Sequence, residues 1–586
     1  MIMKRRGEAQ LNGVSDAGAS DAPSSSSSVC GCGGCARKLR SCIPVSYKEE
    51  TIELLKLVGP VFISQMLIFM ISFVSTVFCG HLGKTELAGV ALAIAVINVT
   101  GLSVGVGLSS ACDTLISQTF GSNNLKRVGV ILQRGILILL LACFPCWAVL
   151  INTESIMLAV RQSPTVASLS QLYVKIYMPA LPAAFMFQLQ AKYLQNQGII
   201  WPQVITGAAG NILNALINYI FLHLLNLGIA GSAMANSISQ FALAVFLYVY
   251  IRWKGLHKAT WDGWSRDCLQ EWGPFFRLAL PSMLMLCVEW WTYEIGGFLA
   301  GLISEVELGA QSIVYEVATI AYMFPLGFGV AASVRVGNAL GAGNTQQAKL
   351  SSKMSLICGL MVSCVVGAAL TGSKDIIAYI FTTDTEIVER VSGIMVMYGG
   401  FHLFDAVAGI TGGIVRGAGK QLLGAGCMLV GYYFVGFPIG VSLMFVLKMG
   451  IVGLWTGLFV CIFLQSIFFL IIIYKLDWKR ATEEALKRAG VQTAEAKPEA
   501  YALENVCVDE DVRRMEAQPR EGEQTDVEAK EENNEERSVE NGVAVTVGDV
   551  LTTKQLVVRR GLAILLMILI LAAGITLNEI LTGLLR

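Results

Sequence analysis

Long apolar runs alternate with short polar connections over most of this chain. A helix that spans a bilayer needs about 20 mainly apolar residues, and thirteen segments reach that length. They are apolar on all sides, unlike β-barrel strands, which alternate in polarity over about ten residues. The pattern therefore predicts an all-α integral membrane protein. The runs are 54–79, 87–112, 130–151, 168–191, 203–225, 229–251, 275–302, 308–333, 354–372, 391–414, 421–447, 451–474 and 561–582.

Composition supports this class and removes others. Hydrophobic residues make up 54% and charged residues 15% of the 586 residues, and the mean hydropathy is +0.61. Soluble globular domains average about 25% charged residues. The sequence has no G-x-x-x-x-G-K-[ST] motif for ATP, so we expect a carrier driven by an ion gradient and not an enzyme. We expect the lipid bilayer, and no nucleic acid, as its environment.

The first twelve runs form two halves that resemble each other at a period near 221 residues. Glu86-Leu-Ala-Gly89 aligns with Glu307-Leu-Gly-Ala310, and Gln118-Thr-Phe-Gly121 meets Asn338-Ala-Leu-Gly341 after a slip of one residue. Internal repeats are typical of carriers that alternate access around a site near the bilayer midplane. We therefore predict a twelve-helix core of two six-helix lobes related by a pseudo-twofold axis, plus a thirteenth C-terminal transmembrane helix.

Charge and composition predict the domains and the orientation. Lys and Arg gather in alternate connections, and such connections stay in the cytoplasm, so we expect a cytoplasmic N-terminus and an extracellular C-terminus. The stretch 504–540 is strongly acidic, as disordered linkers are. The expected divisions are a cytoplasmic tail at 1–50, an N-lobe at 51–254, an inter-lobe loop at 255–274, a C-lobe at 275–476, an acidic cytoplasmic linker at 477–558, and the last helix with its terminus at 559–586.

Four cysteines, Cys30, Cys32, Cys35 and Cys42, gather in the N-terminal tail. Palmitoylation and metal binding are the alternatives for this cluster. Because it contains no His, we expect no metal site. The cysteines in the apolar runs are expected to be small apolar filler.

Four acids lie inside the apolar runs: Glu289, Glu294, Glu316 and Asp405. A charged side chain at the centre of a membrane helix costs about 2.5–3.5 kcal/mol on insertion scales, and such residues mark ion, proton or substrate pathways. No Lys or Arg occupies an equal depth in these runs, so a buried pair that locks helices is the weaker interpretation. We expect the four acids to be titratable groups of a transport site.

Aromatic residues accompany the acids. Tyr293 shares the helix face of Glu289, and Trp290 shares that of Glu294, while the two acids point about 140° apart and are not expected to share one site. Carboxylates and aromatic faces together suit a cation, although Trp290 is alternatively a residue of the interfacial belt. Further candidates for the substrate cleft are Tyr315, beside Glu316, and His402, one turn before Asp405.

The first half carries neutral polar residues in place of these acids. Gln65 and Asn98 are candidates for its side of the substrate cleft. Asn211, Asn214 and Asn218 fall on one helix face, where interhelical hydrogen bonds and a cavity lining remain equal alternatives. Asp113, near the cytoplasmic end of its run, is expected to be solvated.

Three long motifs carry a family resemblance: Pro281-Ser-Met-Leu-Met-Leu-Cys-Val-Glu289-Trp-Trp-Thr-Tyr-Glu294, Val306-Glu-Leu-Gly-Ala-Gln-Ser-Ile-Val-Tyr-Glu316, and Ala331-Ala-Ser-Val-Arg335-Val-Gly-Asn338-Ala-Leu-Gly-Ala-Gly343. With them, about residues 45–480 resemble the vertebrate multidrug and toxin extrusion (MATE) family, in its type 1-like branch. The thirteenth helix after a long linker also fits the animal members.

The resemblance implies electroneutral exchange of an external proton for an internal organic cation or drug. It also implies a plasma-membrane location, apical in epithelia, and the proton as coupling ion with no other cofactor. The family's acids fall on Glu289, Glu294, Glu316 and Asp405, and the last departs from the family pattern His-Leu-Phe-Glu. Many prokaryotic members carry an Asp in the first helix, where Gln65 is the nearest polar residue here.

Three other functions remain open. A carrier of the same fold driven by Na⁺ is the first alternative, and a channel or receptor is the second. A lipid or oligosaccharide flippase would be expected to line its cleft with Arg or Lys for phosphate, and the apolar runs supply none. The oligomeric state and the substrate range stay undetermined.

Overall fold

The computed structural model describes residues 45–80, 83–491 and 551–585, and within these ranges every regular element is a helix. Twelve helices there are long and apolar enough to cross a membrane. A thirteenth, α12 (Trp272–Gly301), has 30 residues with two acids among its apolar ones and is about 45 Å long at 1.5 Å per residue. Each predicted apolar run overlaps one of these helices, so the prediction of an all-α membrane protein is confirmed. Both lobes belong to one compact unit, which begins at residue 49.

The first six spans form the N-lobe. Several spans contain π-helical or 3₁₀ segments, written η. The elements are α2 (Val45–Gly80), α3 (Lys84–Ile97), η1 (Asn98–Leu102), α4 (Ser103–Ser109), α5 (Ala111–Gly121), α6 (Leu125–Leu150), α7 (Thr153–Ala159), α8 (Pro164–Tyr177), η2 (Met178–Ala180), α9 (Leu181–Gln195), α10 (Trp201–Tyr219), η3 (Ile220–Leu224) and α11 (Gly228–Trp253).

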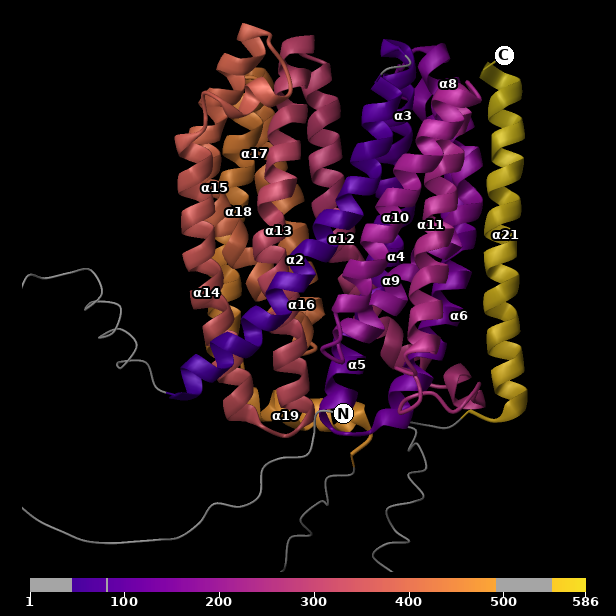
Figure 1. The fold of residues 1–586 in the computed structure, drawn as a ribbon, viewed down its shortest axis with the longest axis vertical. Helices are drawn as coiled ribbons and strands as arrows, with labels where there is room; N and C mark the ends of the chain where they lie inside the picture. The colour runs from indigo at the N-terminus through magenta and orange to yellow at the C-terminus, as the bar shows by residue number, and fades with distance from the viewer. Residues whose placement is uncertain (1–44, 81–82, 492–550, 586) are drawn as a thin grey trace, which may run out of the picture. The chain divides into compact units, whose positions relative to one another are not determined.

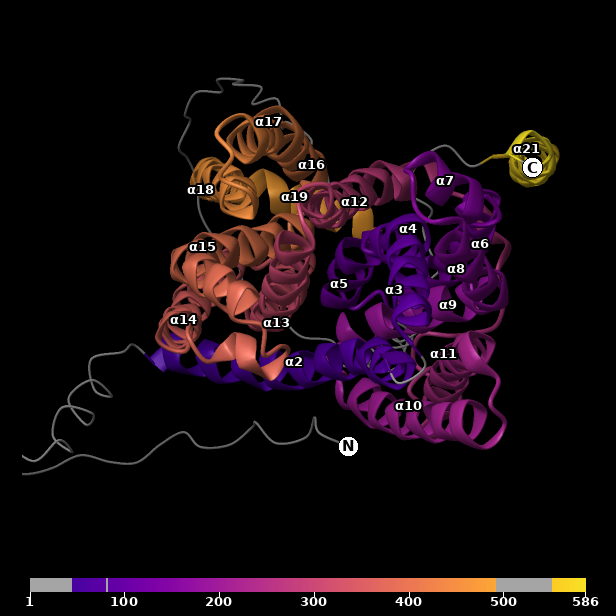
Figure 2. The ribbon, with the colours of Figure 1, turned by 90° about the horizontal axis from the view of Figure 1, so that it is seen from above.

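The next six spans form the C-lobe and are followed by two further helices. Figures 1 and 2 show α3 to α11 gathered in one group and α13 to α18 in another. The elements are η4 (Arg266–Leu269), α12, α13 (Glu305–Gly341), α14 (Thr345–Gly372), η5 (Ile377–Ile380), α15 (Thr385–Gly417), α16 (Gln421–Leu429), η6 (Val430–Gly436), α17 (Phe437–Val441), η7 (Ser442–Val446), α18 (Ile451–Lys475), α19 (Trp478–Ala489) and α21 (Thr553–Leu585).

Local sequence explains several helix starts. The Ser163 hydroxyl caps α8 by accepting from Val166 N at 3.3 Å, and Pro164 follows as the first helical residue. The Ser304 hydroxyl caps α13 by accepting from Glu307 N at 3.1 Å. These are the residue types preferred at helix N-termini, because they satisfy a backbone N–H that has no partner inside the helix.

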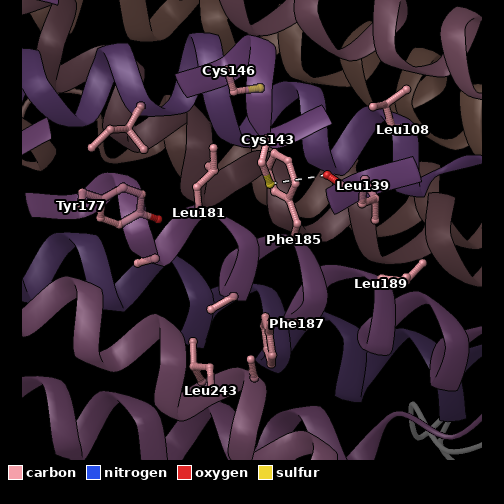
Figure 3. Close-up of a cluster of buried hydrophobic side chains, with 14 of the residues drawn as sticks. Leu108, Leu139, Cys143, Cys146, Tyr177, Leu181, Phe185, Phe187, Leu189 and Leu243 are labelled. Atoms are coloured by element: carbon pink, nitrogen blue, oxygen red, sulfur yellow. Dashed lines mark hydrogen bonds between the residues drawn. The ribbon is translucent and has the colours of Figure 1, made fainter. Parts of the chain in front are cut away.

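Each lobe has its own apolar core. In the N-lobe, Leu139, Cys143 and Phe185 pack among buried side chains of α4, α6 and α9 (Figure 3). The Cys143 thiol donates to Leu139 O at 3.5 Å. Eight of the ten cysteines that the structure describes are buried, which agrees with a role as apolar filler. The tail cluster at 30–42 lies outside the described residues.

The lobes meet where α5 crosses α13. A Cβ added at Gly121 would overlap the carbonyl oxygen of Asn338, and one added at Gly341 would overlap that of Gln118. These are the two segments that the sequence repeat aligns. Only glycine allows backbones to approach this closely. The bundle end with the 122–124 and 342–344 connections, predicted to be cytoplasmic, is called the inner end.

Two glutamates 221 residues apart, Glu50 and Glu271, bind across the lobes at the inner end. Glu271, directly before α12, pairs with Arg127 (2.8 Å) and Arg134 (3.1 Å) of α6. Glu50, in α2, accepts from Arg335 Nε (3.0 Å) of α13. The repeat thus produces the same arrangement twice. In each lobe, a glutamate at the start of the first helix pairs with arginine of the other lobe. We call Glu50 and Glu271, with their partners, the glutamate clasps.

Helix α19 corrects the predicted linker boundary. It begins at Trp478, inside the range 477–558 that the sequence assigned to the acidic linker. The carboxylate of Asp477 accepts from the backbone N–H groups of Lys479 and Arg480 (both 3.1 Å), and Gly490 ends the helix in the left-handed region at φ 80°. Acid-rich composition begins only near residue 504, and the boundary at 477 followed from the end of the apolar run 451–474, which gives no sign of a further helix.

Helix α19 binds both lobes at the inner end. Its Arg488 donates to Gln118 Oε1 (3.1 Å) of the N-lobe, and its Glu484 pairs with Lys420 (2.7 Å) of the C-lobe. Burial disfavours ionised Glu484, but Lys420, Arg488 and Arg480 together hold the pKa of that carboxyl below its ordinary value. The segment is therefore a folded part of the core.

Helix α21 lies along α6 (Figure 1). Asn152 Nδ2 donates to Gly574 O at 3.0 Å. Arg560 donates twice to Leu269 O, at 3.0 and 2.6 Å, and lies over the Trp272 ring at 4.0 Å. The last helix thus contacts the N-lobe and the inter-lobe connection, while most of its side chains remain exposed.

Candidate functional site

Glu289 lies half-buried on α12, between elements of the C-lobe. The Tyr322 hydroxyl of α13 hydrogen-bonds to its carboxylate. Asp405 of α15 lies within electrostatic range of it. Two consecutive helices, α12 and α13, and the more distant α15 therefore bring two acids and a phenol together.

Arg416, in the last turn of α15, also interacts electrostatically with Glu289. The expectation concerned Lys and Arg inside the apolar runs, and Arg416 lies just outside them, so its longer-range effect on Glu289 is an addition to it. The cause is geometric: α15 continues to Gly417, past the apolar run that ended at residue 414, and an Arg side chain reaches several ångströms along its helix. No direct ion pair joins Arg416 to Glu289 among the described residues, so the arginine acts across a distance.

Asp405 is buried, with 6% of its surface exposed. Tyrosines surround it: Tyr293 of α12, Tyr398 of α15 and Tyr432 of η6 all interact with it electrostatically. Tyr398 and Tyr432 are fully buried. Three tyrosines from three elements therefore lie within electrostatic range of the Asp405 carboxyl group.

Glu294 and Glu316 form a second pair, from α12 and α13. The two pairs are distinct, in agreement with the 140° offset of Glu289 and Glu294 along α12. Aromatic rings connect them: Tyr315 interacts with both Glu294 and Glu289, and its ring lies 5.6 Å from that of Tyr293. The four acids thus lie in two neighbouring groups joined by tyrosines.

The remaining candidates differ in their relation to the acids. His402 is buried one turn before Asp405, beside the Tyr398 ring at 6.1 Å, and neither ring nitrogen has a hydrogen-bond partner in the described part of the chain. Trp290 is half-buried on α12. Gln65 of α2 and Asn98 at the start of η1 are half-buried. Within residues 45–80, 83–491 and 551–585, no hydrogen bond connects Gln65 or Asn98 to the four acids.

Hydrogen bonds decide the role of the N-lobe asparagines. Asn214 Nδ2 donates to Ser239 of α11 (3.1 Å), and Asn218 Nδ2 donates to Ser75 of α2 (3.3 Å). Asn211 Nδ2 donates to Leu67 O (2.7 Å). The face therefore connects α10 to its neighbours, as the interhelical interpretation required.

Asp113 is not solvated, contrary to expectation. Its side chain is buried and pairs with Lys192 of α9 at 2.9 Å, and Asn196 donates to it at 3.2 Å. Sequence position near a helix end suggested water, but the neighbouring helix covers this end. Among the described residues no group of three or more His, Cys, Asp or Glu side chains is arranged to hold a metal ion.

A known protein-family model matches each half of this chain. The family model described as MatE matches twice, over residues 60–220 and 281–442. The two matches begin 221 residues apart, which is the period of the sequence repeat.

Several relatives are similar over most of the chain. "Multidrug and toxin extrusion protein 1" of Danio rerio is 76% identical over 569 residues, 97% of this chain and 96% of that protein. The Homo sapiens protein of the same name is 57% identical over 452 residues, 77% of this chain and 79% of that protein. Among solved structures, the eukaryotic MATE transporter AtDTX14 superposes with a TM-score of 0.73 at 29% identity, over 76% of this chain and all of that chain.

Proposed function

The chain belongs to the multidrug and toxin extrusion (MATE) family, and from this premise we propose that it exports small organic cations and drugs in exchange for protons by alternating access. It is a transporter and not an enzyme. The observation that carries the proposal is the group formed by Glu289, Asp405 and Tyr322, in which acids are set among aromatic rings. Carboxylate charge and ring faces both attract organic cations.

The charge of this group supports a one-for-one exchange. Ionised Glu289 supplies one negative charge to this group, and Asp405 lies within electrostatic range of it. Either one proton or one monovalent cation neutralises the Glu289 charge, so the two ligands compete for it. Deprotonated Glu289 binds the cation from the inner side, and a proton from outside then displaces it.

Location and orientation are part of the proposal. We place the protein in the plasma membrane, apical in epithelia, with the N-terminus cytoplasmic and the C-terminus extracellular. The distribution of Lys and Arg supports the orientation. Cysteine labelling at exposed positions of single-cysteine variants, in intact and in permeabilised cells, tests it. Labelling of the C-terminal end in permeabilised cells only would contradict it.

Transport in proteoliposomes tests the function. An interior more acidic than the exterior should drive tetraethylammonium uptake, equally with and without Na⁺. Uptake that requires a Na⁺ gradient and ignores the pH gradient would replace proton coupling by the Na⁺ alternative. Conductive uptake that saturates neither with substrate nor with protons would favour a channel.

Glu289→Gln tests the site itself. The amide keeps the shape but can neither titrate nor neutralise a cation, so coupled exchange should be lost while surface expression persists. Glu386→Gln, at an exposed acid in the first turn of α15, is the matched control and should transport as the wild type does. Wild-type pH-dependent exchange by Glu289→Gln would remove Glu289 from the proposed role.

A further inference from the structure

Gln465, on α18, is a buried side chain whose hydrogen bonds are missing. Only 2% of its surface is exposed, yet neither Oε1 nor Nε2 has a hydrogen-bond partner in the part of the chain that the structure describes. The equally buried Gln311 differs, because its Oε1 accepts from Trp455 Nε1 at 2.8 Å. Unpaired buried amides destabilise a folded protein and are rare. The buried, unpaired carboxamide of Gln465 therefore indicates a functional role.

Contacts between α18 and α15 place Gln465 at the height of Asp405. Thr456 donates to Met397 Sδ at 3.7 Å, and ten residues later Ser466 donates to Phe404 O at 2.7 Å. The two helices thus run in the same direction, and the contact of Ser466 with Phe404 fixes their relative height at this point. The residues that follow Phe404 and precede Ser466 are Asp405 and Gln465, which therefore lie in one layer of the C-lobe.

The span between α15 and α18 contains η6, which lies beside Gln465 and within electrostatic range of Glu289. A Cβ added at Gly431, in the π-helical η6, would lie 3.9 Å from Gln465 Oε1. The next residue, Tyr432, interacts electrostatically with both Glu289 and Asp405. The carboxamide of Gln465 thus lies beside a π-helical segment whose Tyr432 is within electrostatic range of both acids. Such segments often occur at functional sites.

We propose that Gln465 is a substrate-binding residue of the transport site and confers preference for cations that carry N–H groups. Its Oε1 accepts a hydrogen bond from a protonated amine or guanidinium whose charge is held by Glu289 and Asp405. A quaternary ammonium ion has no N–H to donate and gains nothing from this oxygen. The proposal rests on the proposed function and names the class of substrate that the same site distinguishes.

Gln465→Met gives the test. Methionine has the length and the unbranched shape of glutamine but no hydrogen-bonding amide. We expect the ratio of the apparent KM for methylguanidinium to that for tetraethylammonium to rise at least about tenfold, the lower end of the effect of one hydrogen bond to a charged group. Removing two unpaired polar atoms should leave the melting temperature in detergent unchanged or higher.

Gln311→Leu is the matched control, because it removes a buried glutamine that does have a partner. It should lower the melting temperature and leave the ratio of the two KM values as in the wild type. If Gln465→Met proves poorly expressed, Gln465→Asn keeps a shorter carboxamide and should raise the ratio by a smaller factor. An unchanged ratio in a well-folded Gln465→Met, or an unchanged ratio in Gln465→Asn, overturns the proposal.

Different outcomes contradict this inference and the proposed function. Wild-type protein that transports neither cation under a pH gradient would contradict the proposed function. Wild-type transport of both, with equal loss for both in Gln465→Met and a lower melting temperature, would leave the exporter function intact. In that case Gln465 has a structural role only.

Discussion

Replacing Glu271 by Gln should strongly destabilise the junction of the two lobes. The Glu271 side chain is 7% exposed, and its partners Arg127 and Arg134 are 7% and 4% exposed. The substitution keeps the shape but removes the carboxylate charge with which both buried guanidinium groups pair. Breaking a buried ion pair by removing one partner costs about 3–5 kcal/mol, because the remaining charge stays buried.

The second glutamate clasp gives an internal comparison. Arg335, the basic partner of Glu50, is 27% exposed, so water solvates it when the carboxylate is removed. Ser351 donates to Glu50 at 2.6 Å and can donate equally to an amide oxygen. We therefore expect Glu50→Gln to cost about 1–3 kcal/mol, the range for a lost hydrogen bond to a buried group.

The assay is thermal unfolding of purified protein in detergent, in which size-exclusion chromatography measures the folded fraction after heating. For a lobe of about 200 residues, 1 kcal/mol corresponds to about 2–4 °C, so Glu271→Gln should lower the melting temperature by roughly 10 °C. Glu50→Gln should lower it by less, and Glu386→Gln should not change it. Unfolding of Glu271→Gln at the wild-type temperature would refute the reasoning, since it would show that the two arginines are solvated or re-paired.

Three further predictions concern other parts of the molecule. A chain truncated after Val491 should keep exchange, because α19 remains, whereas truncation after Lys475 should lose folded surface protein; surface labelling with uptake measures both. Asp405→Glu should keep substantial exchange and Asp405→Asn should lose most of it, if charge matters more than length, and initial rates normalised to surface protein decide this. The pKa of Glu484 is lowered in the folded protein, so ionised Glu484 stabilises the fold fully above the ordinary pKa of 4.5 and loses this effect as the pH falls through the folded-state pKa. The difference in melting temperature between wild type and Glu484→Gln should therefore shrink toward acid pH.

The amino-acid sequence alone was sufficient to locate the spans, to detect the repeat and to identify the acids. The bilayer imposes its thickness on every spanning segment, so apolar run length alone located the helices from 54–79 to 561–582. Duplication leaves a constant offset along the chain, which is why the period of 221 could be read without any contact and recurred in the two family matches. A charge in an apolar run stands out by its cost, and this identified Glu289 and Asp405 as residues that need a function.

The partners of those acids could be decided only by the tertiary structure. Helical periodicity separated Glu289 from Glu294, but it could not say that Asp405, Tyr322 and Arg416 lie near the first and Glu316 near the second. Such neighbours come from helices that are tens to more than a hundred residues apart, and their relative rotation depends on packing. The burial of Asp113, the docking of α19 and the unpaired amide of Gln465 have the same origin, because solvent exposure and hydrogen bonding are properties of the assembled helices and not of the individual segments.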